Sequence, residues 1–189
     1  QWAGEVVDDW ERRSGMKAHY FPHGYYQLPI EGYSFEKDGV WIGSDTPFRD
    51  ISRFDGLNII TLKSIPEDMV GEAYRTAKIS PNVHLNIQRG EMVNVPESVI
   101  DKPGYAVNER LFWICGAGGF QLADENPLIR EFYDEDEVPT TTAEEFREKF
   151  EYYLAHPEER EKIAKKAHDR TMREHLYEHR ITKILLPLL

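Results

Sequence analysis

The sequence is poor in three features, and each shortage excludes a class of protein. Its one cysteine, Cys115, cannot form an internal disulfide and has apolar neighbours, so we expect an inert core thiol and a reducing, cytoplasmic location. No apolar run approaches the roughly 20 residues that cross a bilayer, so no membrane span is expected. The 23 basic residues face 34 acidic ones, and the net charge of −11 argues against nucleic acid as a partner because its phosphates would be repelled.

Several catalytic and metal-binding motifs are also absent. There is no P-loop, HExxH motif or Ser/His/Asp order, so hydrolase and kinase activities have no support. His19 and His23 have no third ligand near them in the sequence. Asp134 and Asp136 form an Asp-x-Asp pair, but they lie in an acidic stretch that is typical of a solvated turn. We therefore expect no metal and no other cofactor.

From Gly39 onward, short apolar runs alternate with helical patterns. This alternation is typical of a parallel sheet with helices on both faces, and right-handed crossovers make such a sheet doubly wound. The predicted fold class is therefore α/β, with a Rossmann-like sheet and C-terminal helices. The predicted strands are 40–42, 58–62, 83–87, 120–123 and a weak one near Val138. The predicted helices between them are 48–54, 66–78 and 127–133, the second with Pro66 as its first helical residue.

Residues 1–38 are predicted to form a separate region before this domain of residues 39–189. Apolar residues at helical spacing predict a helix over 2–13, and a short strand over 18–21 follows. Residues 22–38 are rich in Gly, Pro and Tyr and have no period, which predicts a linker over the surface.

Three helices are predicted after the sheet. Thr142 and Glu145 have the form of a capping box, which predicts a helix through Leu154, and Pro157 begins the next one. The last helix, through residues 177–185, is expected to pack back across the domain. We expect three polar residues near its start to be structural rather than a binding site, namely His175, His179 and Arg180.

The most informative stretch is 108–124, which reads NERLFWICGAGGFQLAD. Asn108 can accept a hydrogen bond from a free amide of a first helical turn, and the apolar residues after it predict a short buried helix. Glycines including Gly118 end that helix, because glycine accepts a positive φ and lets another backbone or a ligand come close. Asp124 follows the next strand, at the carboxyl end where ligands lie in open α/β sheets.

This stretch resembles the carboxyl-terminal signature of CgeB-type (spore-maturation) glycosyltransferases, which belong to the GT-B superfamily. The signature has an arginine, an aromatic residue, an acidic residue and a small glycine-rich run before an apolar strand. The resemblance covers about residues 40–186 and rests on order and spacing along the chain. The residues that carry it are Trp41 to Ser44, Ala77 to Ile79, Leu85 to Ile87, Arg110, Phe112, Trp113, Gly116 to Phe120, Tyr152 to Leu154, His156 to Arg160 and His175 to Arg180.

The resemblance implies one half of a GT-B enzyme, which binds a sugar nucleotide. It also implies that the acceptor is held mostly by an N-terminal domain of the same or a partner chain. The 189 residues are therefore expected to be a fragment or half that lacks the acceptor domain. The sugar donor and that domain are the expected partners.

A sugar nucleotide requires amide donors, cations and a carboxylate. Gly43 and Ser44, after the first strand of the sheet, allow backbone approach to phosphate, with a plain turn as an equal alternative. Arg110 can bring a guanidinium fork to the diphosphate, or it can form a structural ion pair. Lys78 matches a lysine of the family pattern, with a solvated helix-end lysine as its alternative. The predicted donor-binding residues are Gly43, Ser44, Lys78, Asn108, Glu109, Arg110, Trp113, Gly118 and Asp124.

Trp113 departs from the family pattern, which implies a ribose-binding glutamate at this position. Glu109 lies one helical turn earlier on the same face and can supply the carboxylate instead. The departure therefore leaves two readings. The first is the donor-binding domain of a glycosyltransferase, and the second is a non-catalytic module that binds a nucleotide, a glycan or a protein. A third, a flavodoxin-like regulatory domain, lacks the acidic pocket pattern it requires.

Overall fold

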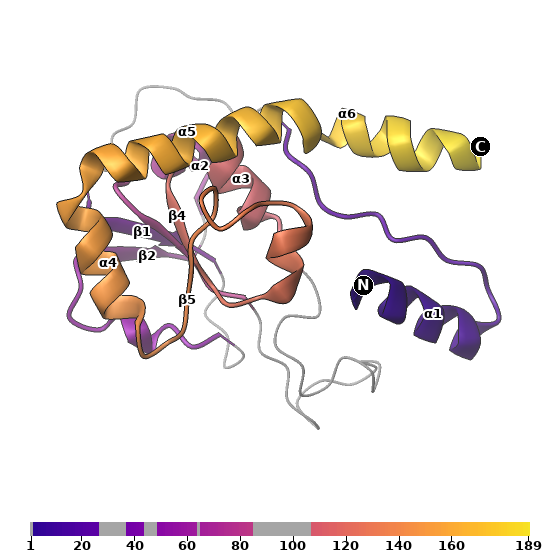
Figure 1. Cartoon of the computed structure of the whole chain (residues 1–189), viewed down its shortest axis with the longest axis horizontal. Coiled ribbons are helices and arrows are strands. Elements are labelled where there is room, and N and C mark those ends of the chain that lie inside the picture. Colours follow the sequence, from indigo (N-terminus) through magenta and orange to yellow (C-terminus); the bar gives the residue numbers. More distant parts are fainter. Residues whose placement is uncertain (1, 27–36, 44–48, 64, 85–106) are drawn as a thin grey trace.

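The structure is a computed structural model that describes residues 2–26, 37–43, 49–63, 65–84 and 107–189. Its centre is parallel β-sheet (Figure 1). Strand β1 (Gly39–Ile42) pairs with β2 (Ile59–Leu62), and β4 (Gln121–Asp124) lies between β3 (Ser80–Asn82) and β5 (Thr140–Thr141). All these pairings are parallel.

A parallel bridge between Gly39 and Ile79 joins the two groups of strands. The amide of Val40 donates to the carbonyl of Ile79 at 3.1 Å, and the strands therefore run in the order β2-β1-β3-β4-β5. The prediction of an α/β fold with parallel sheet is confirmed. Because the strands are parallel, their carboxyl ends lie along one edge.

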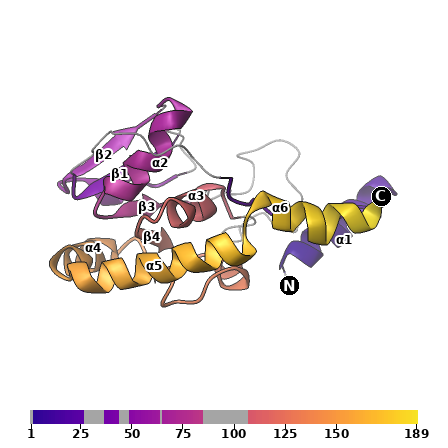
Figure 2. The ribbon, with the colours of Figure 1, turned by 90° about the horizontal axis from the view of Figure 1, so that it is seen from above.

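Helices cover both faces of this sheet (Figure 2). On one face, Val40 packs with Ala73 and Ala77. On the other, the neighbouring Trp41 packs with a cluster that includes Phe54 and Phe146, as the alternation of strand side chains requires. The covering helices are α2 (Glu67–Thr76) and α3 (Arg110–Gly116) on the first face, and α4 (Phe146–Ala155) and the 3-10 turn η1 (Ser52–Phe54) on the second. Helix α5 (Pro157–Glu174) contributes Ile163 and Ala164 to the second cluster, and its Ala167 packs in the cluster that contains α3.

The glycines after α3 have the roles predicted for them. Gly118 has φ +80°, which favours glycine, and its amide donates to the carbonyl of Cys115. A Cβ on Gly119 would lie 2.4 Å from the carbonyl oxygen of Tyr74, so glycine is required where α2 and this turn meet. Cys115 itself is buried, and burial raises the pKa of its thiol to about 12, as expected for an inert core residue.

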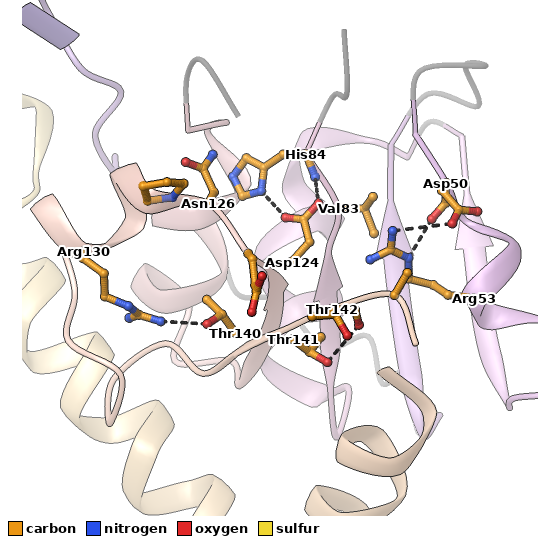
Figure 3. A pocket seen from close by; sticks show the side chains of 13 residues that line it. Asp50, Arg53, Val83, His84, Asp124, Asn126, Arg130, Thr140, Thr141 and Thr142 are labelled. Carbon is orange, nitrogen blue, oxygen red and sulfur yellow. Dashed lines mark hydrogen bonds and ion pairs between the residues drawn. The ribbon is translucent and has the colours of Figure 1, made fainter. Parts of the chain in front are cut away.

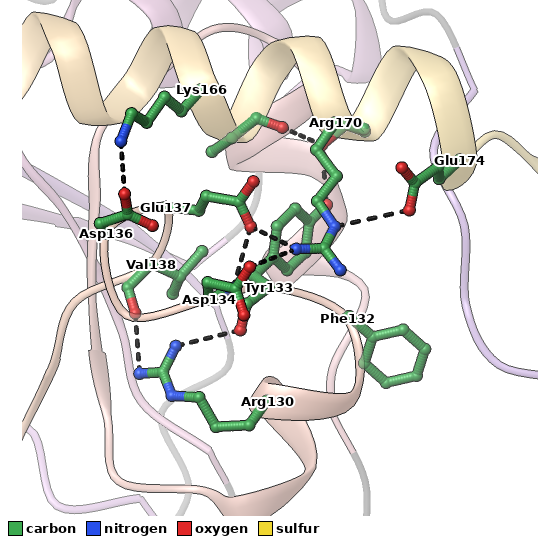
Figure 4. Close-up of polar contacts among 12 residues, drawn as sticks. Arg130, Phe132, Tyr133, Asp134, Asp136, Glu137, Val138, Lys166, Arg170 and Glu174 are labelled. Carbon is green, nitrogen blue, oxygen red and sulfur yellow. Dashed lines mark hydrogen bonds and ion pairs between the residues drawn. The ribbon is translucent and has the colours of Figure 1, made fainter.

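The acidic turn that contains Asp134 and Asp136 fastens helix α5 to the domain (Figure 4). Arg170 of α5 donates to Asp134 at 3.0 Å and to Glu137 at 2.7 Å, and Lys166 pairs with Asp136. These carboxylates therefore hold the helix by ion pairs. Within the described ranges, no group of three or more acidic, histidine or cysteine side chains is placed to hold a metal ion.

Two strand predictions are corrected in their boundaries. The strand expected at 83–87 forms instead at Ser80–Asn82, and residues 85–87 lie outside the described residues. The sequence analysis missed this strand because it contains Pro81, and proline is uncommon in central strands. The amide of Ser80 donates to the carbonyl of Phe120, the residue just before β4. The proline nitrogen at the next position therefore points away from β4, and no bond to that strand is lost. The weak strand expected near Val138 begins two residues later, as β5.

The segment before the sheet differs more strongly from the prediction. Helix α1 (Trp2–Ser14) is confirmed, but residues 18–21 form no strand. Part of the predicted surface linker is buried: Tyr25 is 2% exposed and bridges Leu176 in parallel. A Cβ on Gly116 would lie 2.4 Å from the Tyr25 ring, so the sequence of α3 makes room for it. Residues 27–36 of the linker lie outside the described residues. The division at residue 38 stays a prediction.

The helix predictions vary in accuracy. Helices α4 and α5 are confirmed, but the capping box is not complete. The amide of Glu145 donates to the hydroxyl of Thr142, yet α4 begins at Phe146 with Glu145 as its N-cap, and the Glu145 carboxylate pairs with Lys149. Helix α2 begins one residue later than predicted, with Pro66 as its N-cap, and ends two residues earlier, at Thr76. The helices expected at 48–54 and 127–133 are 3-10 turns, the first shortened to η1 and the second η3 (Pro127–Glu131), and residue 48 is outside the described ranges.

The C-terminal helix does not pack back across the domain. It continues as α6 (Tyr177–Arg180), a π-helical turn η4 (Ile181–Leu185) and the 3-10 turn η5 (Leu186–Leu188), and it extends away from the sheet (Figures 1 and 2). Its apolar residues are exposed, with Leu186 at 55%. No helix in the described ranges is long and apolar enough to cross a membrane.

His175, at the end of α5, is a structural residue as expected. Its Nε2 lies 2.9 Å from the carbonyl of Phe132, and Nη2 of Arg180 lies 2.9 Å from its Nδ1. The carbonyl requires a proton on Nε2, and the guanidinium requires a lone pair on Nδ1, so the ring is neutral. Burial lowers the pKa of His175 to about 4.

We expect this histidine to make the fold sensitive to mild acid. Because the folded pKa lies below the unfolded one, the unfolded chain binds more protons between about pH 4 and about pH 6.5, and stability falls as the pH falls through that window. Between pH 7 and pH 5 the loss should be about 2 kcal/mol. Urea unfolding of the parent and of His175→Gln measures it, because glutamine keeps a donor and an acceptor but does not titrate.

The control is His156→Gln, since His156 is exposed. It should retain the full pH dependence of the parent. A His175→Gln protein that loses as much stability as the parent between the two pH values would contradict the assignment.

Candidate functional site

The candidate site lies at the carboxyl edge of the sheet, where the ends of β1, β3 and β4 meet the start of α3. The central contact is Arg110, which is 6% exposed. Its Nη1 donates to the carbonyl of Ile42 at 2.8 Å, and its Nη2 donates to the carbonyl of Val83 at 2.9 Å. One guanidinium therefore bridges the ends of β1 and β3. Among the described residues its hydrogen-bond partners are backbone carbonyls and not carboxylates. The structural role of Arg110 is therefore to join strand ends, and not to form the ion pair that was the predicted structural alternative.

Gly43 lies so close to the Arg110 guanidinium that a side chain at this position would overlap it. A Cβ at Gly43 would lie 2.3 Å from Nη1 of Arg110 and 2.8 Å from the ring of Trp41. Those distances are too short for any side chain, so glycine here is explained by Arg110. The Arg110 guanidinium also lies 5.4 Å from the centroid of the Trp41 ring, which favours a cation beside it.

A chain of amide side chains sets the start of α3 against the sheet. Asn108 accepts a hydrogen bond from the amide of Leu111 at 3.2 Å, as predicted, and its own amide donates to Asn82 at 2.9 Å. Asn82 in turn donates to Gln121 on β4 at 3.1 Å. Asn82 and Gln121 are buried, so these bonds satisfy groups that would otherwise be costly to bury. The network fixes the α3 start above β3 and β4.

A small cavity of about 200 Å³ opens beside this network. It is lined by five of the predicted donor-binding residues and by three others. The predicted ones are Gly43, Asn108, Glu109, Arg110 and Trp113, and the others are Ile42, Arg49 and Tyr74. The structure thus brings together residues from two segments that are more than sixty positions apart in the sequence.

Glu109 and Trp113 face this cavity with groups that can contact a ligand. The Glu109 side chain is 48% exposed, and its carboxylate lies 3.9 Å from Nε2 of His23. Trp113 is half-buried and packs edge-on against Tyr26, with ring centroids 5.9 Å apart. Its indole Nε1 is buried and has no hydrogen-bond partner among the described residues. The structure therefore agrees with a cavity-lining Trp113.

Arg49 is a cation of this cavity that the sequence did not reveal. Burial lowers the pKa of its guanidinium, and the carboxylates of Glu109 and Asp124 oppose that shift. Arg49 is therefore close enough to both carboxylates for their charges to act on it. Its position shortly after β1 was the one available signal, because residues that follow parallel strands gather at this edge.

A larger cavity of about 510 Å³ lies beside the ends of β3, β4 and β5 (Figure 3). Asp124, predicted as a ligand-binding residue, lines it together with His84, which the sequence analysis missed. One Asp124 oxygen accepts from the backbone amide of His84 at 2.8 Å, and the other lies 2.5 Å from Nδ1 of its ring. The two cavities are neighbours, because Val83 lines the larger one and its carbonyl accepts from Arg110 in the smaller one.

These features agree with what comparison with known proteins shows. The model of the family described as "Glycosyl transferase-like" matches residues 25–186, which is most of the chain. The chain belongs to this glycosyl transferase-like family. A comparison with the curated proteins finds no match.

The glycosyl transferase-like domain does not bring every predicted residue to the site. Lys78 lies before β3, at the amino edge of the sheet, and forms an ion pair of 2.7 Å with Asp38. Gly118 lies between α3 and β4, at the same amino edge, where it serves the backbone turn. Both are therefore removed from the candidate site, because ligands lie at the opposite edge. Ser44 lies outside the described residues.

We expect Gly43 and Arg110 to be energetically coupled in this glycosyl transferase-like domain. Gly43→Ala should lower the free energy of unfolding by about 1 to 3 kcal/mol, because the added methyl group would overlap the guanidinium and the Trp41 ring. Arg110→Ala should also destabilise the domain, because two carbonyls lose their donor. In the Arg110→Ala background, Gly43→Ala should cost less. Urea unfolding of the four proteins gives the coupling energy.

Proposed function

We propose that the domain binds the sugar-nucleotide donor of a glycosyltransferase. The observation that carries the proposal is the small cavity, where Gly43, Asn108, Glu109, Arg110 and Trp113 come together at the carboxyl edge of the sheet. Membership of the glycosyl transferase-like family supports it. The volume of the small cavity is below the roughly 300 Å³ of ordinary ligand pockets, so the cavity holds only part of a nucleotide.

Each lining residue has a role that suits one part of a nucleotide. Glu109 carries an exposed carboxylate, which can accept hydrogen bonds from the two ribose hydroxyls. Trp113 offers a flat apolar face for a base or sugar and an indole N–H that has no described partner. Arg49 and Arg110 supply positive charge for the diphosphate, and Gly43 lines the cavity beside them.

The finer assignment is part of the same proposal. We place the domain as the carboxyl-terminal half of a GT-B enzyme of CgeB type, on the order and spacing of the residues from Trp41 to Arg180. The acceptor hydroxyl is then held mostly by an N-terminal domain of the same or a partner chain, in the cytoplasm.

A non-catalytic binding module is the second candidate. It is favoured by one observation, that Trp113 lies at the cavity where the family resemblance implies a carboxylate. In that case the cavity binds a nucleotide or a glycan without transfer.

The first test concerns Glu109. Titration calorimetry with UDP, GDP and ADP identifies the base that the domain prefers, and Glu109→Gln should weaken binding of that nucleotide about tenfold, because a charged acceptor is lost. The matched control is Glu158→Gln, an exposed glutamate at the start of α5, which should bind as the parent does. A parent protein that binds none of the nucleoside diphosphates would refute the proposal.

The second test compares two tryptophans. Trp113→Glu should fold and should bind the nucleotide at least as well as the parent, because the half-buried position can solvate a carboxylate. Trp41→Glu is the control, since Trp41 is 1% exposed and an unpaired buried charge costs several kcal/mol. Thermal melts of both variants decide it, and a Trp113→Glu protein that collapses as Trp41→Glu does would show that Trp113 is core.

A further inference from the structure

His84 has a geometry that donor binding in the small cavity does not explain. It is 5% exposed, and Asp124 holds it from two directions, with one oxygen on its backbone amide and the other on Nδ1 of its ring. The second ring nitrogen, Nε2, is buried and has no hydrogen-bond partner among the described residues. His84 therefore presents an unsatisfied polar atom at the 510 Å³ cavity that it lines.

The contact with Asp124 also determines which nitrogen of the His84 ring carries the proton. An ionised carboxylate only accepts hydrogen bonds, so Nδ1 must be the protonated nitrogen. In the neutral ring, Nε2 is then a bare acceptor. In Figure 3 it is directed away from Asp124, toward the side of the cavity lined by Asn126. An acceptor in this position requires a ligand that can donate, such as a hydroxyl group.

The rest of the cavity suits a neutral, hydroxyl-rich ligand better than an anion. Its two arginines are already engaged: Arg130 donates to the carbonyls of Tyr133 and Val138 and contacts Glu135, and Arg53 donates to the carbonyl of Asp50. Three carboxylates line it as well, from Asp50, Asp124 and Glu125, so the charge of its lining is net negative. A phosphate would be repelled there.

The remaining polar lining can both donate and accept. Thr141 donates to the carbonyl of Thr142, and the Thr142 hydroxyl accepts from the amide of Glu145. Each of these contacts uses one of the three hydrogen bonds that a hydroxyl can make. Asn126, which is 4% exposed, lies in the same wall, where its side-chain oxygen accepts from the amide of Leu128. Sugars are recognised by this mixture of carboxylate, amide and hydroxyl groups, because each sugar hydroxyl is both a donor and an acceptor.

We propose that the 510 Å³ cavity is a carbohydrate-binding subsite in which Nε2 of His84 accepts a hydrogen bond from a sugar hydroxyl. Asp124 is a positioning residue that sets the tautomer and orientation of the ring. The proposal deepens the proposed function and rests on it, since it adds a sugar-holding cavity beside the one that takes the nucleotide. The volume lies within the roughly 300 to 1,000 Å³ of ordinary ligand pockets, and Val83 is shared between the two cavities.

NMR of histidine-labelled protein tests this. Long-range ¹⁵N spectra should show the Nδ1-protonated tautomer for His84. Methyl glycosides of glucose, galactose, mannose and N-acetylglucosamine are then added in turn, and at least one should shift the His84 ring signals in a saturable way. His84→Asn should weaken binding of that glycoside about tenfold or more, because asparagine keeps a donor for Asp124 but has no atom at the Nε2 position.

Controls separate this proposal from the proposed function. His156→Asn, outside the cavity, should bind the glycoside as the parent does. If UDP, GDP or ADP binds but no glycoside moves the His84 signals, the carbohydrate subsite is wrong and nucleotide binding stands. If neither class binds, the proposed function fails as well. An Nε2-protonated tautomer, a response to inorganic phosphate alone, or a His84→Asn protein that binds the glycoside unchanged would each overturn the inference. Should His84→Asn not fold, the tautomer and the glycoside response of the parent still decide.

Discussion

The guanidinium of Arg110 joins the carboxyl ends of β1 and β3 by donating to Ile42 and Val83, and the candidate site is arranged around that bridge. Burial lowers the pKa of this arginine, yet its ordinary pKa is so high that it stays charged. The charge sits beside the Trp41 ring and forces glycine at position 43. The cost of burying it is offset by bonds that hold two strand ends in one place, so both cavities have a fixed wall.

The two cavities on either side of that wall differ in character. The smaller one contains Arg49, Arg110 and an exposed carboxylate, which suits a ligand that is both anionic and hydroxylated. The larger one is lined by three carboxylates and by two arginines that already donate to backbone carbonyls. It also contains His84, whose Nε2 has no hydrogen-bond partner among the described residues. A nucleotide and a sugar carry these two chemistries within one molecule. The domain is thus divided in a way that matches the parts of an activated sugar.

Much of the fold could be predicted, because the local sequence and the final environment agree. Strands β1 and β4 are largely buried, and β2 is a partly buried apolar run at the end of the strand order. Helices α4 and α5 have apolar stripes of their own, and Pro157 marks the start of α5. The prediction of β3 was wrong because proline is uncommon in central strands and β3 contains Pro81. The strand forms nevertheless, because the backbone nitrogen of residue 81 does not face β4. The C-terminal helix was placed wrongly because an apolar stripe shows that a face can be buried but not what covers it.

The sequence by itself determined the α/β class, the capped start of α3 at Asn108 and the carboxyl-edge position of Asp124, since each follows from patterns within a few residues. Only the tertiary structure decided which long-range pairs form. Arg110, predicted to bind the diphosphate, joins two strand ends in the structure. Lys78 and Gly118 lie at the opposite edge of the sheet, and His84 lies against Asp124. The physical reason is that such contacts join residues 27 to 68 positions apart, whose separation in space is fixed by the sheet order and not by local sequence.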